Sequence, residues 1–220
     1  MSKRYRRTEV LVVGGGATGV CAAIAAARMG RETLIVERYG FLGGMFTGGN
    51  MTVLNCYPVG GIGQEIVEKL ASQGQARMCP DDPPNYPVFH YASEYSTMNL
   101  LYDAEAAKLV VMDLVREAGV QSLLHSYVYE TLTQDSRVVG VELCNKGGTE
   151  TVLADVVIDA TADADIVARA GLDVRKGQGE EGTLFAMTML VRLGNIDWPA
   201  ISEYSESDPG FDRASAEAID

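Results

Sequence analysis

The chain has 220 residues, enough to bury a substantial hydrophobic core in one large domain, or in one domain with part of a second. Its formal net charge of −12 argues against a nucleic-acid-binding surface, because the chain has no basic face that could neutralise phosphates. The four cysteines form no CxxC pair and no apolar run is long enough to span a bilayer, so we expect a soluble, cytoplasmic protein with no metal site and no membrane partner.

The first predicted elements form a strand–helix–strand unit. Residues 1–8 contain a basic cluster, which we interpret as a flexible, solvated arm: Lys3, Arg4, Arg6 and Arg7. The aliphatic run from Glu9 to Val13 is typical of a strand buried on both faces. The alanine-rich run from Ala17 to Met29 predicts a helix, and Gly30 provides its stop. A second buried strand at 33–36 completes the unit, whose crossover we expect to be right-handed.

Loops and two amphipathic helices are predicted next. The segment 40–63 is dense in glycine and predicts few regular elements. A helix ended by Gly74 follows, with an apolar face made by Ile62, Ile66, Val67, Leu70 and Ala71. The proline-rich residues 79–87 exclude a helix or a central strand. Asp103 is placed to cap a second helix, which ends at Gly119.

The second half of the chain reads mainly as strands. Strand-like segments are expected at 120–125, 127–133, 137–144 and 149–153. Turn residues separate the last three, which favours an antiparallel meander. A buried strand at 156–158 leads into a short helix ending near Gly171, and a last strand is expected at 185–193, before a weakly patterned acidic tail. This order predicts an α/β protein with a parallel central sheet and a three-stranded antiparallel meander.

Three glycines follow the first strand with the spacing GxGxxG: Gly14, Gly16 and Gly19. Gly14 permits a tight turn, Gly16 lets a diphosphate approach the backbone because it has no side chain, and Gly19 allows the helix to pack closely on the sheet. The helix N-terminus offers unpaired N–H groups to phosphates. Glu37 ends the second strand, where its carboxylate can accept hydrogen bonds from ribose hydroxyls and would repel the 2′-phosphate of NADP. The unit therefore predicts dinucleotide binding.

The glycine unit alone leaves open whether the dinucleotide is FAD or NAD. A nicotinamide dehydrogenase domain would continue with regular strand–helix units, whereas this chain has a glycine-rich loop, a helix and a meander before the next parallel strand. That layout resembles the two-dinucleotide-domain flavoproteins related to glutathione reductase, and more closely the FAD-dependent oxidoreductase family. The resemblance extends over residues 9–195 and rests on VLVVGGGATGVCAAIAAARMG, LIVERYGFLGGMFTGG, DAEAAKLVVMDLVREAGV, VVGVELCNKGG and ADVVIDATADADIVARAG.

The resemblance implies a Rossmann-like FAD-binding domain with a defined set of cofactor-binding residues. The residues implied to surround the diphosphate are Gly14, Gly15, Gly16, Ala17, Thr18 and Gly19. Glu37 would hold the adenosine ribose, with Arg38 beside it. Gly43 and Gly44 of the GFLGG loop would pass close to FAD, and the backbone of Val128 would pair with adenine.

The chain departs from the family pattern in two places. Where the family has Ala-Thr-Gly, this chain has Ala-Thr-Ala with Thr161 at its centre, and the added methyl group relaxes a close approach of the backbone to the cofactor. Asp163 then either contacts the cofactor or caps the next helix. Family members are also much longer, so we expect an N-terminal fragment: an FAD-binding domain at 9–180 with a loop-rich excursion at 40–100, and the beginning of an incomplete substrate domain at 181–220.

The sequence identifies no catalytic side chain. His125 fits a structural role at the end of a strand, His90 is a weak candidate for acid–base catalysis, and Cys56 is more typical of an apolar core residue than of a redox thiol. A flavin carries hydride chemistry itself, so an enzyme needs no such side chain. We therefore predict an FAD-dependent oxidoreductase that acts on an unidentified small molecule. Two alternatives stay open: a dinucleotide-binding module without redox activity of its own, and an NAD-linked dehydrogenase.

Overall fold

The computed structural model describes residues 4–54, 60–78, 100–179, 182–184, 187, 189–191 and 194–207. Its helices are α1 (Ala17–Arg28), α2 (Met45–Gly48), α3 (Gly61–Ser72), α5 (Ala104–Glu117), α6 (Asp165–Arg169) and α7 (Trp198–Ser207). Its strands are β1 (Arg4–Val13), β2 (Thr33–Val36), β3 (Val53–Leu54), β4 (Ala76–Met78), β5 (Leu100–Tyr102), β6 (Gln121–Leu123), β7 (Tyr127–Gln134), β8 (Arg137–Asn145) and β9 (Gly148–Asp159).

The central sheet has the strand order β6-β2-β1-β9-β8-β7. The pairs β6–β2, β2–β1 and β1–β9 are parallel, whereas β9, β8 and β7 pair antiparallel. All four residues of β2 are buried, as the continuous apolar run of a doubly covered strand requires. The α/β class, the parallel centre and the meander expected from the sequence are therefore confirmed.

Strand β9 is longer than the sequence suggested. Two strands were expected, at 149–153 and 156–158, but one continuous strand runs from Gly148 to Asp159. Its first half pairs with β8 on one side and with β1 on the other, and its second half continues along β1. The strand is unbroken because β1 pairs with it along most of its length, from Glu150 to Asp159, although the charged Asp155 interrupts the apolar pattern.

The expectation of a flexible basic arm is wrong for residues 4–8, which form the first half of β1. Arg6 Nε lies 2.9 Å from Glu150 Oε1, and Arg7 pairs with Asp155. Both carboxylates come from β9, the neighbouring strand. The basic residues are therefore ordered because acidic residues of the adjacent strand face them.

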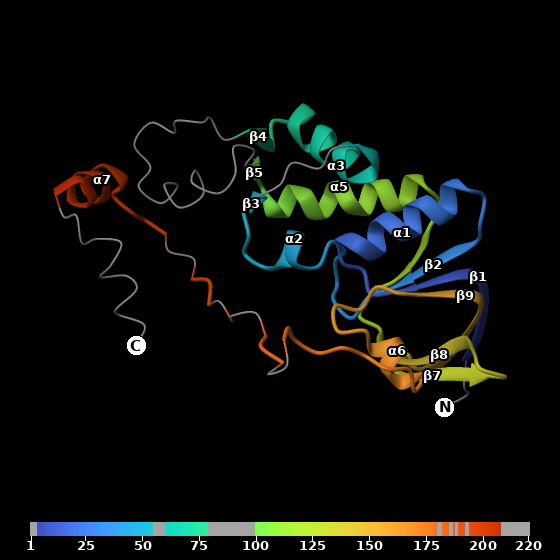
Figure 1. Ribbon diagram of the computed structural model, residues 1–220. Helices are drawn as coiled ribbons and strands as arrows, with labels where there is room; N and C mark the ends of the chain where they lie inside the picture. Colours follow the sequence, from blue (N-terminus) through green and yellow to red (C-terminus); the bar gives the residue numbers. More distant parts are fainter. Residues whose placement is uncertain are drawn as a thin grey trace.

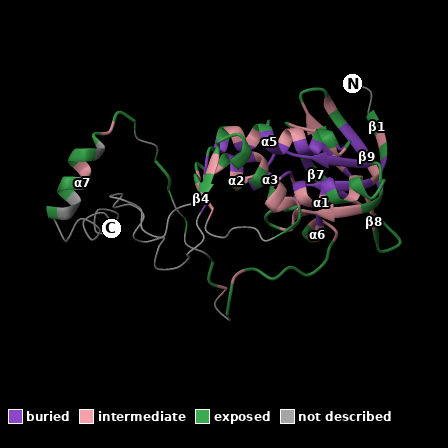
Figure 2. Ribbon diagram, turned by 90° about the horizontal axis from the view of Figure 1, so that it is seen from above, coloured by how far each residue is buried: buried purple, intermediate pink, exposed green. Residues whose placement is uncertain are grey.

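Two hydrophobic clusters cover the two faces of the sheet. Alternate residues of β1 point to opposite faces: Val10 and Val12 pack beneath α1, α3 and α5, whereas Leu11 and Val13 pack against β7, β8 and α6. Figure 1 shows the three helices above the central strands and the β7–β8 hairpin with α6 below them. Buried residues run along the central strands and α5 in Figure 2. The N-terminal end of α1 is thereby fixed at the edge where β1 ends.

The helix ends follow local sequence signals. Gly30 lies just beyond α1 and Gly119 just beyond α5, and each has a φ angle of +81°. The Asp103 side chain accepts a hydrogen bond from Ala106 N at 2.8 Å and caps α5, as expected. A small antiparallel sheet of β3, β5 and β4 lies beside α2 and α5.

The C-terminal segment differs from the sequence-based expectation. Within the expected strand 185–193, the described residues 187 and 189–191 belong to no strand, and Met187 is 99% exposed. The tail contains α7, which lies apart from the layers in both views. The local sequence signal for the start of α7 is Asp197, whose side chain accepts a hydrogen bond from Ala200 N at 3.2 Å.

Candidate functional site

The glycine loop between β1 and α1 is built by close backbone packing. Gly14 has a φ angle of +100°, and a Cβ there would overlap with the carbonyl oxygen of Ala160. A Cβ on Gly19 would overlap with the carbonyl oxygen of Gly14. The turn role expected for Gly14 and the packing role expected for Gly19 are therefore confirmed, since no side chain fits at either position.

Gly16 differs from these two glycines because it has space around it. It is the N-cap residue of α1, with an extended backbone (φ −66°, ψ 179°), and a Cβ there would meet no atom within 4 Å. No side chain caps the helix, and its first turn contains no acidic residue. The first N–H groups of α1 and the positive end of its dipole are therefore available to an anion at this position.

Glu37 lies beside this loop, buried and held by the backbone. Its carboxylate accepts hydrogen bonds from Gly15 N at 2.6 Å and from Tyr39 N at 2.8 Å, and the residue is only 7% exposed. A carboxylate offers about four lone-pair positions, so acceptor capacity remains after these two bonds. The group therefore braces the glycine loop and can still accept from a ligand hydroxyl.

The GFLGG loop packs on the glycine loop. Gly43 N donates to Gly15 O at 2.7 Å, and the two loops form a bridge at Gly16 and Gly43. A Cβ on Gly44 would lie 2.9 Å from Gly16 Cα. The two glycine-rich stretches are therefore a single structural unit, although 27 residues separate Gly16 from Gly43.

A cavity of about 660 Å³ lies where these loops meet the ends of β2, β7 and β9. Pockets of this size typically hold small-molecule ligands and cofactors. The structure brings together, on its wall, ten of the residues that the sequence implicated: Gly14, Gly16, Ala17, Thr18, Glu37, Arg38, Gly44, Val128, Thr161 and Asp163. The other three, Gly15, Gly19 and Gly43, lie behind this wall, where their backbones support it.

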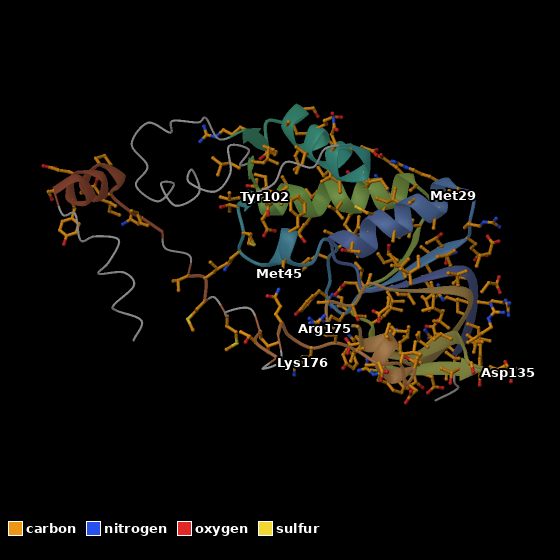
Figure 3. All side chains as sticks on the ribbon, viewed as in Figure 1. Met29, Met45, Tyr102, Asp135, Arg175 and Lys176 are labelled. Carbon is orange, nitrogen blue, oxygen red and sulfur yellow. The ribbon has the colours of Figure 1, made fainter. Side chains whose placement is uncertain are left out.

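Several residues of the wall were not expected from the sequence. Tyr39 and Phe41 follow Glu37, and their rings stack at a centroid distance of 5.7 Å. Met45, on α2, lies at the end of the molecule where α1 begins, whereas Met29 lies at the far end of that helix (Figure 3). The other unexpected side chains include Ser126, Tyr127, Asp165 and Arg169. Of these unexpected residues, Tyr39 and Phe41 had the clearest local signal, because they lie close to Glu37 in the sequence.

Asp159 organises the far side of the cavity through α6. Its carboxylate accepts hydrogen bonds from the N–H groups of Ile166 and Val167, each at 3.0 Å, and from the Thr161 hydroxyl at 2.6 Å. Burial alone would raise the pKa of this carboxyl, but the hydrogen bonds outweigh it and lower the pKa. The sequence did not predict this role, because Asp159 ends β9 and lies six positions before α6 begins.

The N-cap role considered for Asp163 is wrong. The N-cap residue of α6 is Ala164, with a φ angle of +55°, and the hydrogen bonds of the first turn go to Asp159 and Thr161. Among the described residues, none forms a hydrogen bond with the Asp163 carboxylate, which lies at the cavity wall. Contact with the cofactor, the other role considered for Asp163, stays a prediction.

Among the described residues, the remaining sequence candidate, His125, is not part of the cavity wall. His125 is exposed, and its backbone N–H donates to Tyr39 O at 3.0 Å, in agreement with a structural role. His90 and Cys56 lie outside the described residues. Tyr102 donates its hydroxyl to Phe46 O at 2.8 Å and holds α2. Burial raises the pKa of Tyr102 to about 12, so the hydroxyl keeps its proton at neutral pH.

The family model for FAD dependent oxidoreductases matches residues 9–219. The chain belongs to this family. FAD is the family's cofactor and its members are oxidoreductases, so the resemblance and the cofactor expected from the sequence are confirmed. The family match also disfavours the NAD-linked dehydrogenase.

Curated relatives include a synthase and a reductase. Thiamine thiazole synthase of Aeropyrum pernix is 31% identical over 140 residues, which are 63% of this chain and 44% of the relative. Digeranylgeranylglycerophospholipid reductase 1 of Methanococcoides burtonii is 25% identical over 174 residues, which are 75% of this chain and 40% of the relative. The chain therefore spans less than half the length of these relatives.

The fold is shared with solved structures. The THI4 protein of Thermovibrio ammonificans superposes with a TM-score of 0.55 at 20% identity, over 78% of this chain and 67% of that chain. At this identity the likeness supports the fold alone. In the part of the chain that the structure describes, no helix has the length and apolarity that crossing a membrane requires.

Proposed function

We propose that this chain provides the FAD-binding part of an oxidoreductase that exchanges a hydride with a small-molecule substrate. The observation that carries the proposal is the open position at Gly16, beside an uncapped helix N-terminus and the buried Glu37 carboxylate. A diphosphate needs N–H donors and open space, which the helix N-terminus at Gly16 offers. An adjoining ribose needs a hydrogen-bond acceptor, which the Glu37 carboxylate offers. The residues present therefore fit the ADP part of FAD.

The remaining residues of the cavity wall have roles in the same arrangement. Ala17, Thr18 and Arg38 line the cavity. Ala17 and Thr18 would give backbone N–H groups to the diphosphate, and Arg38 would lie beside the ribose. Val128 lies on β7, where its backbone would face the adenine. Gly44, Thr161 and Asp163 also line the cavity. We assign them to the part that would hold the rest of the cofactor, beyond the diphosphate.

Bound FAD supplies the hydride chemistry, and the residues of this chain bind it, orient it and exclude water from its diphosphate. We assign residues 9–180 to the FAD-binding domain and residues 181–220 to the beginning of a substrate domain. This division is supported by the packed layers up to α6 and by the exposed segment that follows them. The absence of paired cysteine motifs favours the cytoplasm as the compartment.

The experiment is to purify the chain, record its visible absorption spectrum and identify the cofactor after denaturation. The proposal predicts a flavin spectrum and the release of FAD, or uptake of added FAD by the apoprotein. A colourless protein that binds ADP-ribose compounds and refuses FAD would contradict it and favour a dinucleotide-binding module without redox activity.

A further inference from the structure

Thr47 is a buried residue that the cofactor wall does not include. It lies on α2 and is only 2% exposed. Its hydroxyl donates to Leu42 O at 2.6 Å, within the GFLGG loop, and a Cβ on Gly43 would overlap with the Thr47 side chain. Thr47 thus links α2 back to the loop that precedes it.

Gly43 and Gly44 come directly after Leu42, the residue whose carbonyl accepts this hydrogen bond. Gly43 and Gly44 have φ angles of +106° and +57°, a backbone region open mainly to glycine. Glycine has the greatest conformational freedom of any residue, so these two positions need an outside constraint to keep one conformation. The hydrogen bond from Thr47 fixes the peptide directly before them.

The constraint reaches the diphosphate position through the backbone. Gly43 N donates to Gly15 O, and Gly44 packs on Gly16 Cα, the open position of the proposed cradle. Gly44 and Met45 themselves line the cavity. A displacement of the Leu42 carbonyl would therefore move both the cavity wall and the loop that should receive the diphosphate.

We infer that Thr47 is a positioning residue for FAD, acting through the GFLGG loop and not by contact with the cofactor. The inference rests on the proposed function. It assigns the hydroxyl of Thr47, and not the bulk of its side chain, as the group that sets cofactor affinity.

Three variants test this. Thr47→Val keeps the shape of the side chain but places a methyl group where the hydroxyl meets Leu42 O, whereas Thr47→Ser keeps the hydroxyl. Thr33→Val is the matched control, because Thr33 is 1% exposed and its hydroxyl also donates to a backbone carbonyl, that of Arg31, at 2.9 Å. Thr33 begins β2, at the end of the strand opposite Glu37.

The measurement is the FAD dissociation constant of each apoprotein, from quenching of flavin fluorescence, together with urea unfolding. Thr47→Val should raise the dissociation constant about tenfold or more, which is the size expected for losing one buried hydrogen bond. Thr47→Ser should stay within about twofold of the unaltered chain, and so should Thr33→Val even where its unfolding midpoint falls. If Thr47→Val does not fold, Thr47→Ala removes the hydroxyl without a clash and should give the same weakening.

Unchanged FAD binding by the folded Thr47 variant that lacks the hydroxyl would overturn the inference. Equal weakening in Thr47→Ser would also overturn it, since the hydroxyl would then not be the determinant. Equal weakening in Thr33→Val would reduce the effect to general destabilisation. If the unaltered chain binds no FAD, the proposed function fails and the inference with it, which is a different result from a difference among variants.

Discussion

Glu37 combines two roles in one buried carboxylate. It accepts hydrogen bonds from Gly15 N and Tyr39 N, which ties the glycine loop to the residues after β2. Its remaining acceptor positions are the ones proposed for the ribose. A residue with both roles should affect the stability of the apoprotein as well as cofactor affinity, because removal leaves backbone donors without a partner.

Substitution of Glu37 by glutamine tests the two roles together. The amide has one acceptor oxygen, and its NH₂ group would face a backbone donor. We expect the free energy of unfolding of the apoprotein to fall by about 1–3 kcal/mol, and the FAD dissociation constant to rise by at least tenfold. Urea unfolding and FAD titration measure the two effects. A fully stable Glu37→Gln protein would show that the two backbone hydrogen bonds contribute little.

Asp159 gives the site a defined response to acid. Its pKa is lowered in the folded protein from the ordinary value of 3.8, so its contribution to stability is present above this value. That contribution is lost as the pH falls from about 4 through the lower folded pKa. Asp159→Asn should therefore be less stable than the unaltered chain at pH 7, and the difference between them should shrink below pH 4. Chemical unfolding at a series of pH values checks this, and a constant difference would contradict it.

At the scale of elements, the strand–loop–helix unit from β1 to α1 contains two kinds of glycine within a few residues: those needed for packing and one proposed for ligand binding. Gly14 and Gly19 are enclosed by backbone, whereas Gly16 is open. The same glycine-to-alanine change should thus have opposite consequences at two positions in one loop.

Gly16→Ala and Gly19→Ala form the matched pair. The added methyl group of Gly16→Ala meets no protein atom but enters the space proposed for the diphosphate, so stability should stay within about 0.5 kcal/mol while FAD affinity falls tenfold or more. Gly19→Ala overlaps with the Gly14 carbonyl, and should cost several kcal/mol, roughly the range of overpacked cores. Thermal unfolding and FAD titration distinguish them. Unimpaired FAD binding by Gly16→Ala would place the diphosphate elsewhere.

At the scale of the whole molecule, the helix layer is held by its apolar cluster and not by its ion pairs. Arg28 and Glu65 join α1 to α3, with nitrogen–oxygen distances of 2.7 Å, but both side chains are about 40% exposed. Exposed pairs are screened by water and salt. Leu70, on α3, is fully buried in the cluster beneath the helices.

Loss of the ion pair should therefore lower the free energy of unfolding much less than loss of core packing does. Glu65→Gln should change the free energy of unfolding by less than about 1 kcal/mol, and less still at high salt. Leu70→Ala should cost about 2–5 kcal/mol, because it leaves a cavity in a packed cluster. Urea unfolding at low and high salt gives both values. Similar losses for the two variants would contradict this division.

The sequence predicted the elements whose signals are local. The aliphatic runs of β1 and β2, the cap at Asp103 and the glycines after the helices each rest on neighbouring residues, and they appear where expected. The glycine loop and Glu37 belong to this group, because turn, helix start and strand end all lie within one short stretch.

The features that the sequence did not predict depend on distant partners. Residues 4–8 are a strand because their backbone pairs with residues 150–154 of β9, which also places Glu150 and Asp155 near the basic side chains. The α6 helix is capped from Asp159, several residues before it begins. The packing of the GFLGG loop on Gly15 and Gly16 is likewise tertiary, and so no spacing rule could have placed Thr47.

The central claim is that the amides opening α1 receive a diphosphate. Its most direct test is a titration of the ¹⁵N-labelled apoprotein with ADP, followed through the backbone amide signals. We predict that the signals of Gly16, Ala17 and Thr18 shift strongly, together with that of Tyr39, while the signal of Asp135 in the distant β7–β8 turn stays in place. ADP that shifts other amides and leaves these unchanged, or that does not bind at all, would contradict the account.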